Sequence, residues 1–192
     1  MKHIRGIIFD LDGTLVTSSL DFLAIKHEIG CPDHEDVLCF LKSLPEQKQH
    51  EAMSIIHRHE LRDAERSEWM PGARAFVDQC LAENIPMAIV TRNSHHPTRV
   101  KIKRNSIPIH RVITRENSKP KPDPSALLQI ANDFGLSTYS MLMVGDYKYD
   151  LEAGRNAKMH SCLINYPSLP DYHHLADYTF EHFDLLHQAM FK

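Results

Sequence analysis

The sequence predicts an α/β protein, a doubly wound, Rossmann-like parallel sheet core with a small helical cap inserted after the first strand. Two observations support this fold class. Short apolar runs alternate with segments of helical periodicity over most of the chain, which is the pattern of parallel βαβ units. From about residue 17 to residue 70, helical segments follow one another without a strand between them. We therefore expect a core domain of residues 1–16 and 71–192 and a helical cap of residues 17–70.

Five short apolar runs are predicted to be the strands of the sheet, because runs of this length bounded by polar or turn residues are typical of buried strands. They are IRGIIF from Ile4, PMAIV from Pro86, RVIT from Arg111, SMLMV from Ser140 and SCLIN from Ser161. Helical segments separate them, so the strands are expected to run parallel.

Four helices are predicted in the core domain, at 72–84, 124–135, 149–157 and 181–190. The helix at 124–135 begins with a proline and ends at a glycine, as helices often do. The helix at 72–84 carries an apolar stripe that we expect to pack on the sheet, formed by Ala73, Phe76, Val77, Cys80 and Leu81.

Two helices are predicted in the cap, at 36–44 and 46–68. Each carries one apolar stripe, which is Val37, Leu41 and Leu44 in the first helix and Ala52, Ile55, Ile56 and His59 in the second. Asp33 is predicted to cap the N-terminus of the first helix. We expect the hinges of the cap near 16–19 and 69–72.

The composition argues against several classes of function. A formal net charge of −3 and the lack of a block of lysines and arginines give no support to a nucleic-acid or membrane-surface partner. No apolar run approaches the ~20 residues of a membrane span, and the first residues lack the pattern of a signal peptide. Four scattered cysteines favour reduced thiols and a cytoplasmic location. The fourteen histidines lack zinc-ligand spacing, so we expect solvated side chains.

Polar residues follow each of the first four predicted strands, at the point where the strand ends. In an open parallel sheet the carboxyl ends of the strands meet at one edge, and ligands bind in the crevice outside that edge. We therefore expect these residues to share one functional site. They are Asp10 and Asp12, then Thr91, Arg92 and Asn93, then Lys119 and Lys121, and finally Gly145 and Asp146.

This set of groups suits phosphoryl transfer with a magnesium ion. Asp10 and Asp12 lie one residue apart after an apolar strand and repel each other, and a cation offsets that repulsion. Asp10 and Asp146 can hold Mg²⁺ through their oxygens. The metal, a lysine and backbone N–H groups, such as those of the turn at Gly13, can neutralise a phosphoryl group. One aspartate can act as nucleophile and the other as general acid and base.

The segments DLDGT, TRN, KPKPDP and GDYKYD resemble, in this order, the four motifs of the haloacid dehalogenase-like hydrolase superfamily. The resemblance spans about residues 4–165 and places a helical cap between the first two motifs, as in phosphoglycolate phosphatase-like members. It implies the same fold class, a Mg²⁺ cofactor and a small-molecule phosphoester substrate. The interval between the first two motifs is short for a member with a full helical cap. This predicts a reduced lid, with looser specificity or a larger substrate.

The resemblance also implies roles for single residues. Asp10 would be the nucleophile, and Asp12 the general acid and base whose backbone carbonyl also ligates Mg²⁺. Thr91 would bind the phosphoryl oxygens, Asp146 would ligate the metal, and Asp150 would support it directly or through water. Members that cleave carbon–halogen bonds lack an aspartate at the position of Asp12, so its presence favours phosphoester chemistry.

Two assignments stay open at this point. Either Lys119 or Lys121 can be the lysine of the third motif, and the spacing to the helix that ends in glycine favours Lys121. Either Arg92 or Asn93 can face the substrate, because the second motif reads Thr-Arg-Asn where many relatives have Thr-Asn.

Structural roles compete with some of the proposed functional ones. Thr91 can cap the helix that follows it, Asp150 can interact with a helix dipole, and His95 and His96 can be surface residues rather than substrate contacts. The predicted function is that of a Mg²⁺-dependent phosphatase that hydrolyses a small phosphorylated metabolite through an aspartyl-phosphate intermediate. The alternatives are a sugar phosphomutase of the same superfamily and a non-catalytic, phosphoester-binding regulatory module. The oligomeric state is open, with a monomer as the expectation.

Overall fold

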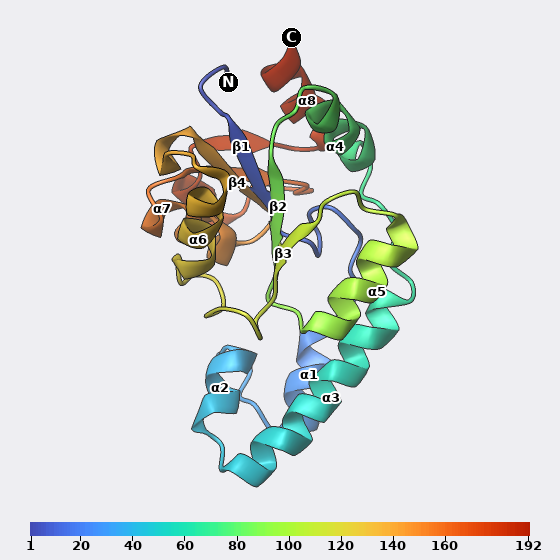
Figure 1. The fold of residues 1–192 in the computed structure, drawn as a ribbon. Coiled ribbons are helices and arrows are strands. Elements are labelled where there is room, and N and C mark those ends of the chain that lie inside the picture. Colours follow the sequence, from blue (N-terminus) through green and yellow to red (C-terminus); the bar gives the residue numbers. More distant parts are fainter.

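The computed structural model describes residues 1–192 and contains a six-stranded sheet in which all neighbouring strands pair in parallel. The strand order is β3-β2-β1-β4-β5-β6 (Figure 1). The predicted Rossmann-like parallel sheet is confirmed. The strands are β1 Gly6–Phe9, β2 Met87–Val90, β3 Arg111–Ile113, β4 Met141–Gly145, β5 His160–Ile164 and β6 Tyr178–Phe180.

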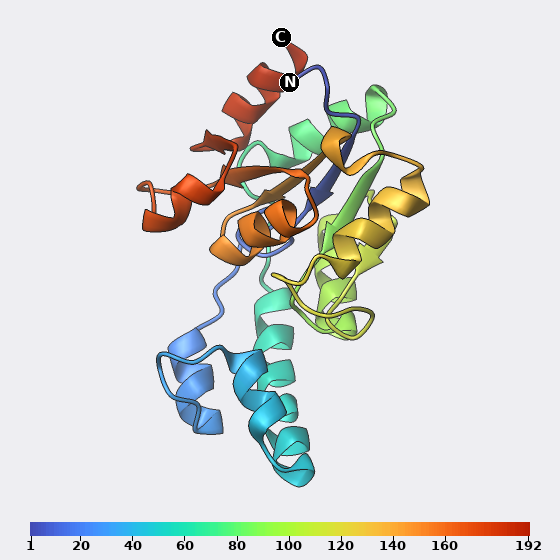
Figure 2. The ribbon, with the colours of Figure 1, turned by 90° about the vertical axis from the view of Figure 1, so that its left-hand side faces the viewer.

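Helices cover both faces of this sheet. α4 (Ala73–Ala82) and α8 (Phe183–Phe191) pack on one face, and α6 (Ser125–Phe134) and α7 (Lys148–Asn156) pack on the other. Figure 1 separates the two pairs on either side of the strands, and Figure 2 shows the same layers from the side. None of the helices has both the length and the apolar character that crossing a membrane requires.

The alternation of side chains along each strand divides the core into two clusters. In β1, Ile7 and Phe9 join the larger cluster with α4 and α8, whereas Ile8 joins the second cluster with α6 and α7. In β4, Leu142 and Met143 divide in the same way. The uninterrupted apolar runs in the sequence therefore result from burial of the strands on both faces.

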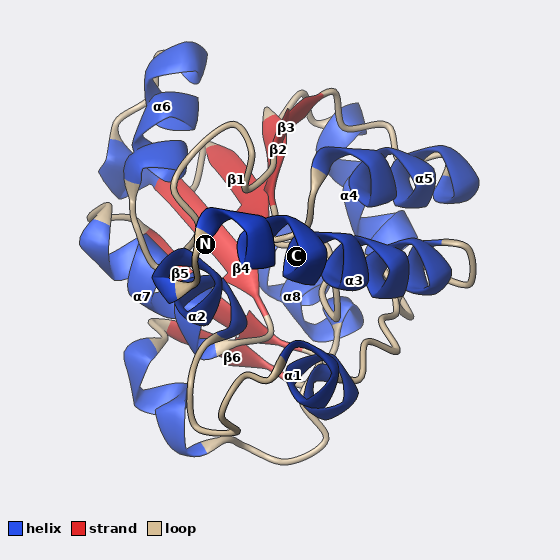
Figure 3. Ribbon diagram, turned by 90° about the horizontal axis from the view of Figure 1, so that it is seen from below, coloured by secondary structure: helices blue, strands red, loops and turns tan.

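Helices α1 (Phe22–Ile29), α2 (Val37–Ser43) and α3 (Glu46–Ala64) form a helical unit between β1 and α4. Their small core contains no residue of the sheet and consists of Ile25, Val37, Leu41, Ala52 and Ile56. The unit lies beyond the carboxyl ends of the strands, and Figure 3 shows it in front of the sheet when viewed from that end. Its long helix α3 packs along α5 (His95–Asn105). The predicted helical insertion after the first strand is confirmed, whereas its exact function and domain bounds stay predictions.

Three elements, α1, α5 and β6, are not among the predicted helices and strands, and α5 was missed because few of its residues are apolar. α1 carries Lys26, His27 and Glu28 in its second half, so its apolar pattern is too short to identify a helix. β6 has three residues, all of them at least partly exposed, and it extends the edge of the sheet. All three elements form because they pack against longer neighbours, which a local sequence pattern does not reveal.

Two expectations about single residues were wrong. Asp33 does not cap α2, because Asp36 occupies the N-cap position and its carboxylate accepts hydrogen bonds from the backbone N–H groups of Leu38 and Cys39 at 3.1 Å. Leu81 does not belong to the buried face of α4, since it is 45% exposed.

The packing of α4 can be tested at Phe76, which is fully buried and lies with its ring centroid 6.1 Å from that of Phe9 and 5.5 Å from that of Phe183. We expect Phe76→Ala to lower the free energy of unfolding by about 3–5 kcal/mol, because it leaves a cavity under the helix. Leu81→Ala on the same helix is the matched control and should cost less than about 1 kcal/mol. Urea denaturation followed by circular dichroism measures both. Equal losses would mean that α4 packs through a different face.

Candidate active site

The predicted site residues converge on one cavity at the carboxyl ends of the strands. The cavity has a volume of about 600 Å³, and its walls come from both the sheet edge and the helical unit. Lys119 is not one of its wall residues. The walls do include every residue proposed as catalytic, phosphate-binding or metal-binding, namely Asp10, Asp12, Gly13, Thr91, Arg92, Asn93, Lys121, Asp146 and Asp150.

Lys121 lies at the centre of this set, with a side chain that is 1% exposed. Its ammonium donates to Asp10 Oδ1 at 2.6 Å and to the backbone carbonyl of Val90 at 2.7 Å, and Asp150 Oδ1 lies 2.7 Å away. Burial by itself lowers the pKa of Lys121, but the charges of Asp10 and Asp150 outweigh it, so the pKa is raised. The ammonium is therefore charged and held in place. The side chain of Lys119 is 76% exposed, so the structure brings Lys121 and not Lys119 to the site.

Asp150 has two partners and so combines the two roles considered for it. Its Oδ2 accepts a hydrogen bond from the backbone N–H of Tyr147 at 3.1 Å, at the start of α7, while Oδ1 pairs with Lys121. Burial raises the pKa of Asp150 to about 6, against the opposing charge of Lys121. Gly145 permits this approach, because a Cβ there would lie 2.3 Å from Asp150 Cβ. Asp150 therefore both stabilises the helix N-terminus and belongs to the site.

Asp146 is the carboxylate of the site that pairs with no cationic side chain. Thr14 Oγ1 donates to its Oδ1 at 3.0 Å. Burial, together with the charges of Asp10 and Asp150, raises the pKa of Asp146 to about 8. Gly13 packs directly against it with φ of +73°, and a Cβ there would lie 2.4 Å from Asp146 Oδ2. Only glycine fits at this turn without strain.

Asp10, Asp146 and Asp150 form a candidate metal centre. Each offers one carboxylate oxygen, and these three atoms lie within 4.8 Å of one another. Burial and, after it, repulsion from Asp10 and Asp150 raise the pKa of Asp146, so a bound cation would offset the cost of its negative charge. Oxygen donors of this kind suit a hard divalent cation. The arrangement therefore fits the magnesium ion that the sequence implies.

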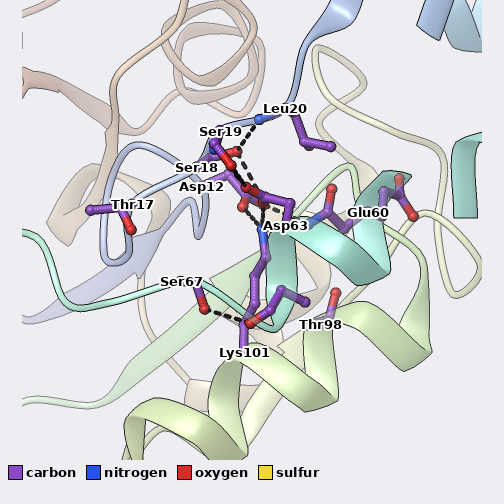
Figure 4. A network of polar contacts seen from close by, with 12 residues as sticks. Asp12, Thr17, Ser18, Ser19, Leu20, Glu60, Asp63, Ser67, Thr98 and Lys101 are labelled. Atoms are coloured by element: carbon purple, nitrogen blue, oxygen red, sulfur yellow. Dashed lines mark hydrogen bonds and ion pairs between the residues drawn. The ribbon is translucent and has the colours of Figure 1, made fainter. Parts of the chain in front are cut away.

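The carboxylate of Asp12 is held by two donors. Asn93 Nδ2 donates to Oδ2 at 2.6 Å, and Lys101 Nζ donates to Oδ1 (Figure 4). Burial raises the pKa of Asp12 to about 7, and the charge of Lys101 opposes this rise. A carboxyl group that exchanges its proton near neutral pH is suited to general acid and base chemistry.

Thr91 and the two histidines after it differ in their position relative to the cavity. Thr91 is buried, and its Oγ1 accepts a hydrogen bond from the backbone N–H of Asn93 at 3.1 Å. The N-cap of α5 is Ser94, so Thr91 does not cap that helix. His95 and His96 are exposed and do not line the cavity, which agrees with surface positions.

Arg92 lines the cavity, but its guanidinium is engaged by the protein. It donates to the backbone carbonyl of Lys121 at 2.9 Å and to Asp36 Oδ2 at 2.6 Å, and it lies over the ring of Tyr149 at 4.3 Å from the centroid. Asn93 instead faces Asp12. The sequence left open which of these two residues faces the substrate. In the structure, Arg92 contacts the helical unit and Asn93 contacts a carboxylate of the site.

Ion pairs between the core and the helical unit were not found from the sequence. Three cations of the core each meet one carboxylate of the unit, and two of those carboxylates are buried on α3. Charged residues in a helical pattern usually lie on the solvated face, so the pattern gave no signal for them. The pairs are Arg92 with Asp36, Arg115 with Glu60, and Lys101 with Asp63.

Asn165 is a further residue that sequence reasoning missed. It follows β5, and its Nδ2 donates to the backbone carbonyls of Gly13 and Thr14, both at 2.9 Å. It thus braces the loop that carries Asp12. The rule used for the first four strands, that polar residues after a strand lie at the ligand edge, finds Asn165 when it is applied to the fifth.

At the carboxyl edge of the parallel sheet, a buried lysine therefore lies between two carboxylates, with a third carboxylate beside them. Residues 23–164 match the haloacid dehalogenase-like hydrolase family, and the chain belongs to this family. The resemblance seen in the four sequence motifs is confirmed.

Relatives and solved structures agree with this assignment. An uncharacterized hydrolase of Saccharomyces cerevisiae is 33% identical over 172 residues, which cover 85% of this chain and 78% of the relative. The pyrophosphatase PpaX of Bacillus velezensis is 29% identical over 175 residues, 81% of each chain. The phosphoglycolate phosphatase of Chromobacterium violaceum is 24% identical over 193 residues, 86% of this chain and 87% of the relative. The crystal structure of a hydrolase from Pseudomonas syringae has the same fold, with a TM-score of 0.81 at 21% identity over 96% of this chain and 97% of that one.

The raised pKa values predict a pH-dependent stability for the metal-free protein. The pKa values of Asp12, Asp146 and Asp150 rise from 3.8 to about 7, 8 and 6 on folding. At pH values between the unfolded pKa and the folded pKa of each group, the folded protein holds a proton that the unfolded chain has released. The free energy of unfolding therefore falls as the pH rises from about 4 to about 8. A shift of one pKa unit corresponds to ~1.4 kcal/mol of stability, and a loss of 1 kcal/mol lowers the melting temperature of a protein of this size by ~2–4 °C. We therefore expect the melting temperature in chelator to fall by at least about 3 °C across this window.

Asp146→Asn tests the origin of this dependence, because the amide can still accept the hydrogen bond from Thr14 but cannot ionise. The variant should lose part of the slope of melting temperature against pH, whereas Asp78→Asn at an exposed position should keep the wild-type slope. Differential scanning fluorimetry in chelator measures all three proteins. A wild-type melting temperature that rises with pH, or an unchanged slope in Asp146→Asn, would contradict the prediction.

Proposed function

We propose that this protein is a Mg²⁺-dependent phosphatase that hydrolyses a small phosphorylated metabolite, phosphoglycolate phosphatase-like in its chemistry, through an aspartyl-phosphate on Asp10. The observation that carries the proposal is the buried Lys121 between Asp10 and Asp150, with Asp146 beside them on the wall of one cavity. Membership of the hydrolase family supports the reaction class.

The first half of the proposed reaction forms the aspartyl-phosphate. An oxygen of Asp10 attacks phosphorus, the bond from phosphorus to the ester oxygen breaks, and Asp12 gives its proton to that oxygen as it leaves. The Lys121 ammonium, 2.6 Å from Asp10, and the hydroxyl of Thr91 neutralise and orient the phosphoryl oxygens. The backbone N–H of Gly13 itself donates to the carbonyl of Val16 at 2.8 Å, so the N–H groups beside it in the turn would supply any further donors.

The second half releases phosphate. Asp12, now a carboxylate, takes a proton from water, the water oxygen attacks phosphorus, and the bond to Asp10 breaks to restore its carboxylate. Asp10, Asp146 and the backbone carbonyl of Asp12 would hold Mg²⁺, with Asp150 in support. When bound, the ion supplies positive charge against the phosphoryl oxygens in both steps.

We further propose that residues 17–70 act as a cap over the site. Phe22, Ile25 and Val37 of the helical unit line the cavity opposite the catalytic aspartates, so the unit would contact the leaving group and exclude water. The cavity of about 600 Å³ has room for a small metabolite. The predictions of a reducing, cytoplasmic location and of a monomer rest on the sequence alone.

Asp10→Asn tests the nucleophile. We expect wild-type protein to release inorganic phosphate from some members of a panel of phosphoesters with Mg²⁺ but not with chelator, and the variant to lose at least about 10³-fold in rate, because an amide does not form the phosphoryl ester. Asp78→Asn, at an exposed position on α4, is the matched control and should retain wild-type activity. A colorimetric phosphate assay gives the rates.

The outcomes of that assay separate the candidate functions. Activity that survives Asp10→Asn would identify a different nucleophile. Turnover that requires a sugar bisphosphate would indicate a mutase, and binding of phosphoesters without release would indicate a regulatory module.

Lys121→Met and Lys119→Met form a second matched pair. Lys121→Met removes the only ammonium that contacts Asp10, so we expect kcat to fall by about 10²–10³-fold. Lys119→Met changes the same charge at a position that is 76% exposed and should leave kcat within about 2-fold. Steady-state kinetics on the best ester of the panel measures both. A larger loss in Lys119→Met would reverse the assignment.

A further inference from the structure

Lys101 is a buried cation that lies outside the cavity. It belongs to α5, its side chain is 0% exposed, and it does not line the cavity, so it does not reach a bound substrate. Burying an ammonium group costs several kcal/mol unless close opposite charges compensate it. The position of Lys101 therefore depends on its partners.

Those partners are two carboxylates from different parts of the chain. The ammonium donates to Asp12 Oδ1 and to Asp63 Oδ2, and Figure 4 shows the side chain extending from α5 to both. Asn93 holds the other oxygen of Asp12 at 2.6 Å. Each oxygen of Asp12 thus has its own donor, and the carboxyl group has one defined orientation at the cavity wall.

Asp63 lies where the chain enters and leaves the helical unit. It lies in the last turn of α3, and its carboxylate accepts hydrogen bonds from the backbone N–H of Ser19 at 2.5 Å and from the hydroxyls of Ser18 and Ser19 at 3.1 and 3.0 Å. The segment that enters the unit and the helix that leaves it therefore meet at Asp63. Lys101 joins this meeting point to Asp12.

We propose that Lys101 is a positioning residue, which fixes the Asp12 carboxyl group toward the leaving-group side of the cavity and is itself fixed by Asp63, where the chain enters and leaves the helical unit. The inference rests on the proposed function, because it takes Asp12 as the group that serves the leaving oxygen. The Lys101 ammonium lies between the two carboxylates and offsets the electrostatic repulsion between Asp12 and Asp63. Without Lys101, the two carboxylates face each other and Asp12 keeps Asn93 as its one remaining donor, so its orientation is less well fixed.

The leaving group provides a readout that a purely structural role would not change. An alkoxide leaves poorly unless it receives a proton from a well-placed acid, whereas a nitrophenolate leaves without one. We expect Lys101→Met to lower the rate at which the alkyl phosphate that wild type hydrolyses fastest releases its alcohol in a single turnover by about 10–100-fold. For p-nitrophenyl phosphate we expect the single-turnover release of nitrophenolate to change by less than about 3-fold. The single-turnover rates report the first half-reaction alone, because the second half-reaction also uses Asp12 and is common to both esters.

Matched variants keep the test decisive. Lys103→Met changes the same charge at an exposed position of α5 and should leave both rates unchanged. Lys101→Gln keeps a donor for Asp12 and should recover part of the alkyl activity. If Lys101→Met does not fold, Asp63→Asn serves instead, because its amide oxygen still accepts from Ser19. We expect it to lose about 3–10-fold on the alkyl ester only.

Equal losses in the single-turnover rates of the two esters, or no loss in either, would overturn the inference and leave Lys101 with a role in stability alone. Wild-type protein that hydrolyses only the aryl ester would also overturn it, since Asp12 would then serve no leaving group. Wild-type protein that releases phosphate from neither ester would refute the proposed function itself, and this result is known before any variant is made.

Discussion

The crowding of carboxylates at one edge of the sheet is the constraint on which the rest of this structure depends. Four aspartates follow β1 and β4, and these strands are direct neighbours that end side by side. Repulsion and loss of water both oppose such an arrangement. Two buried lysines offset most of it. Lys121 lies between Asp10 and Asp150, and Lys101 lies between Asp12 and Asp63, so Asp146 is left as the carboxylate that a metal ion would compensate.

The same need for opposite charge fixes the helical unit over the site. Its own core is small, and three of its carboxylates pair with cations of the core domain. Buried ion pairs add little net stability but penalise every arrangement in which one partner is left alone. The pairs of Glu60 and Asp63 on α3 therefore define where the unit sits more than how stable it is. The ion pairs that balance the charges near the site therefore also determine where the helical unit lies.

The sequence predicted the parts of this protein that depend on short-range pattern. Buried strands and the residues after them are contiguous in the chain, and parallel topology brings the strand ends together, so the group around Asp10 and Lys121 could be foreseen. Lys101 could not, because a lysine in a polar helix is ordinarily solvated and only the packing of α3 on α5 buries it. α1 and β6 were missed because each is too short to show a periodicity of its own, and α5 was missed because it is polar along most of its length.

The ion pairs also limit which groups of the helical unit remain available to a substrate. The carboxylates of Asp36 and Glu60 line the cavity but are already engaged by Arg92 and Arg115. Phe22 lines the same cavity with 60% of its surface exposed and no charged partner. An exposed apolar side chain on the wall of a cavity gains free energy when a ligand buries its surface. Under the proposed cap role, the leaving group would therefore meet the apolar side chains of α1 and the ionisable residues between α1 and α2, which are Asp33, His34 and Glu35, rather than the carboxylates of Asp36 and Glu60.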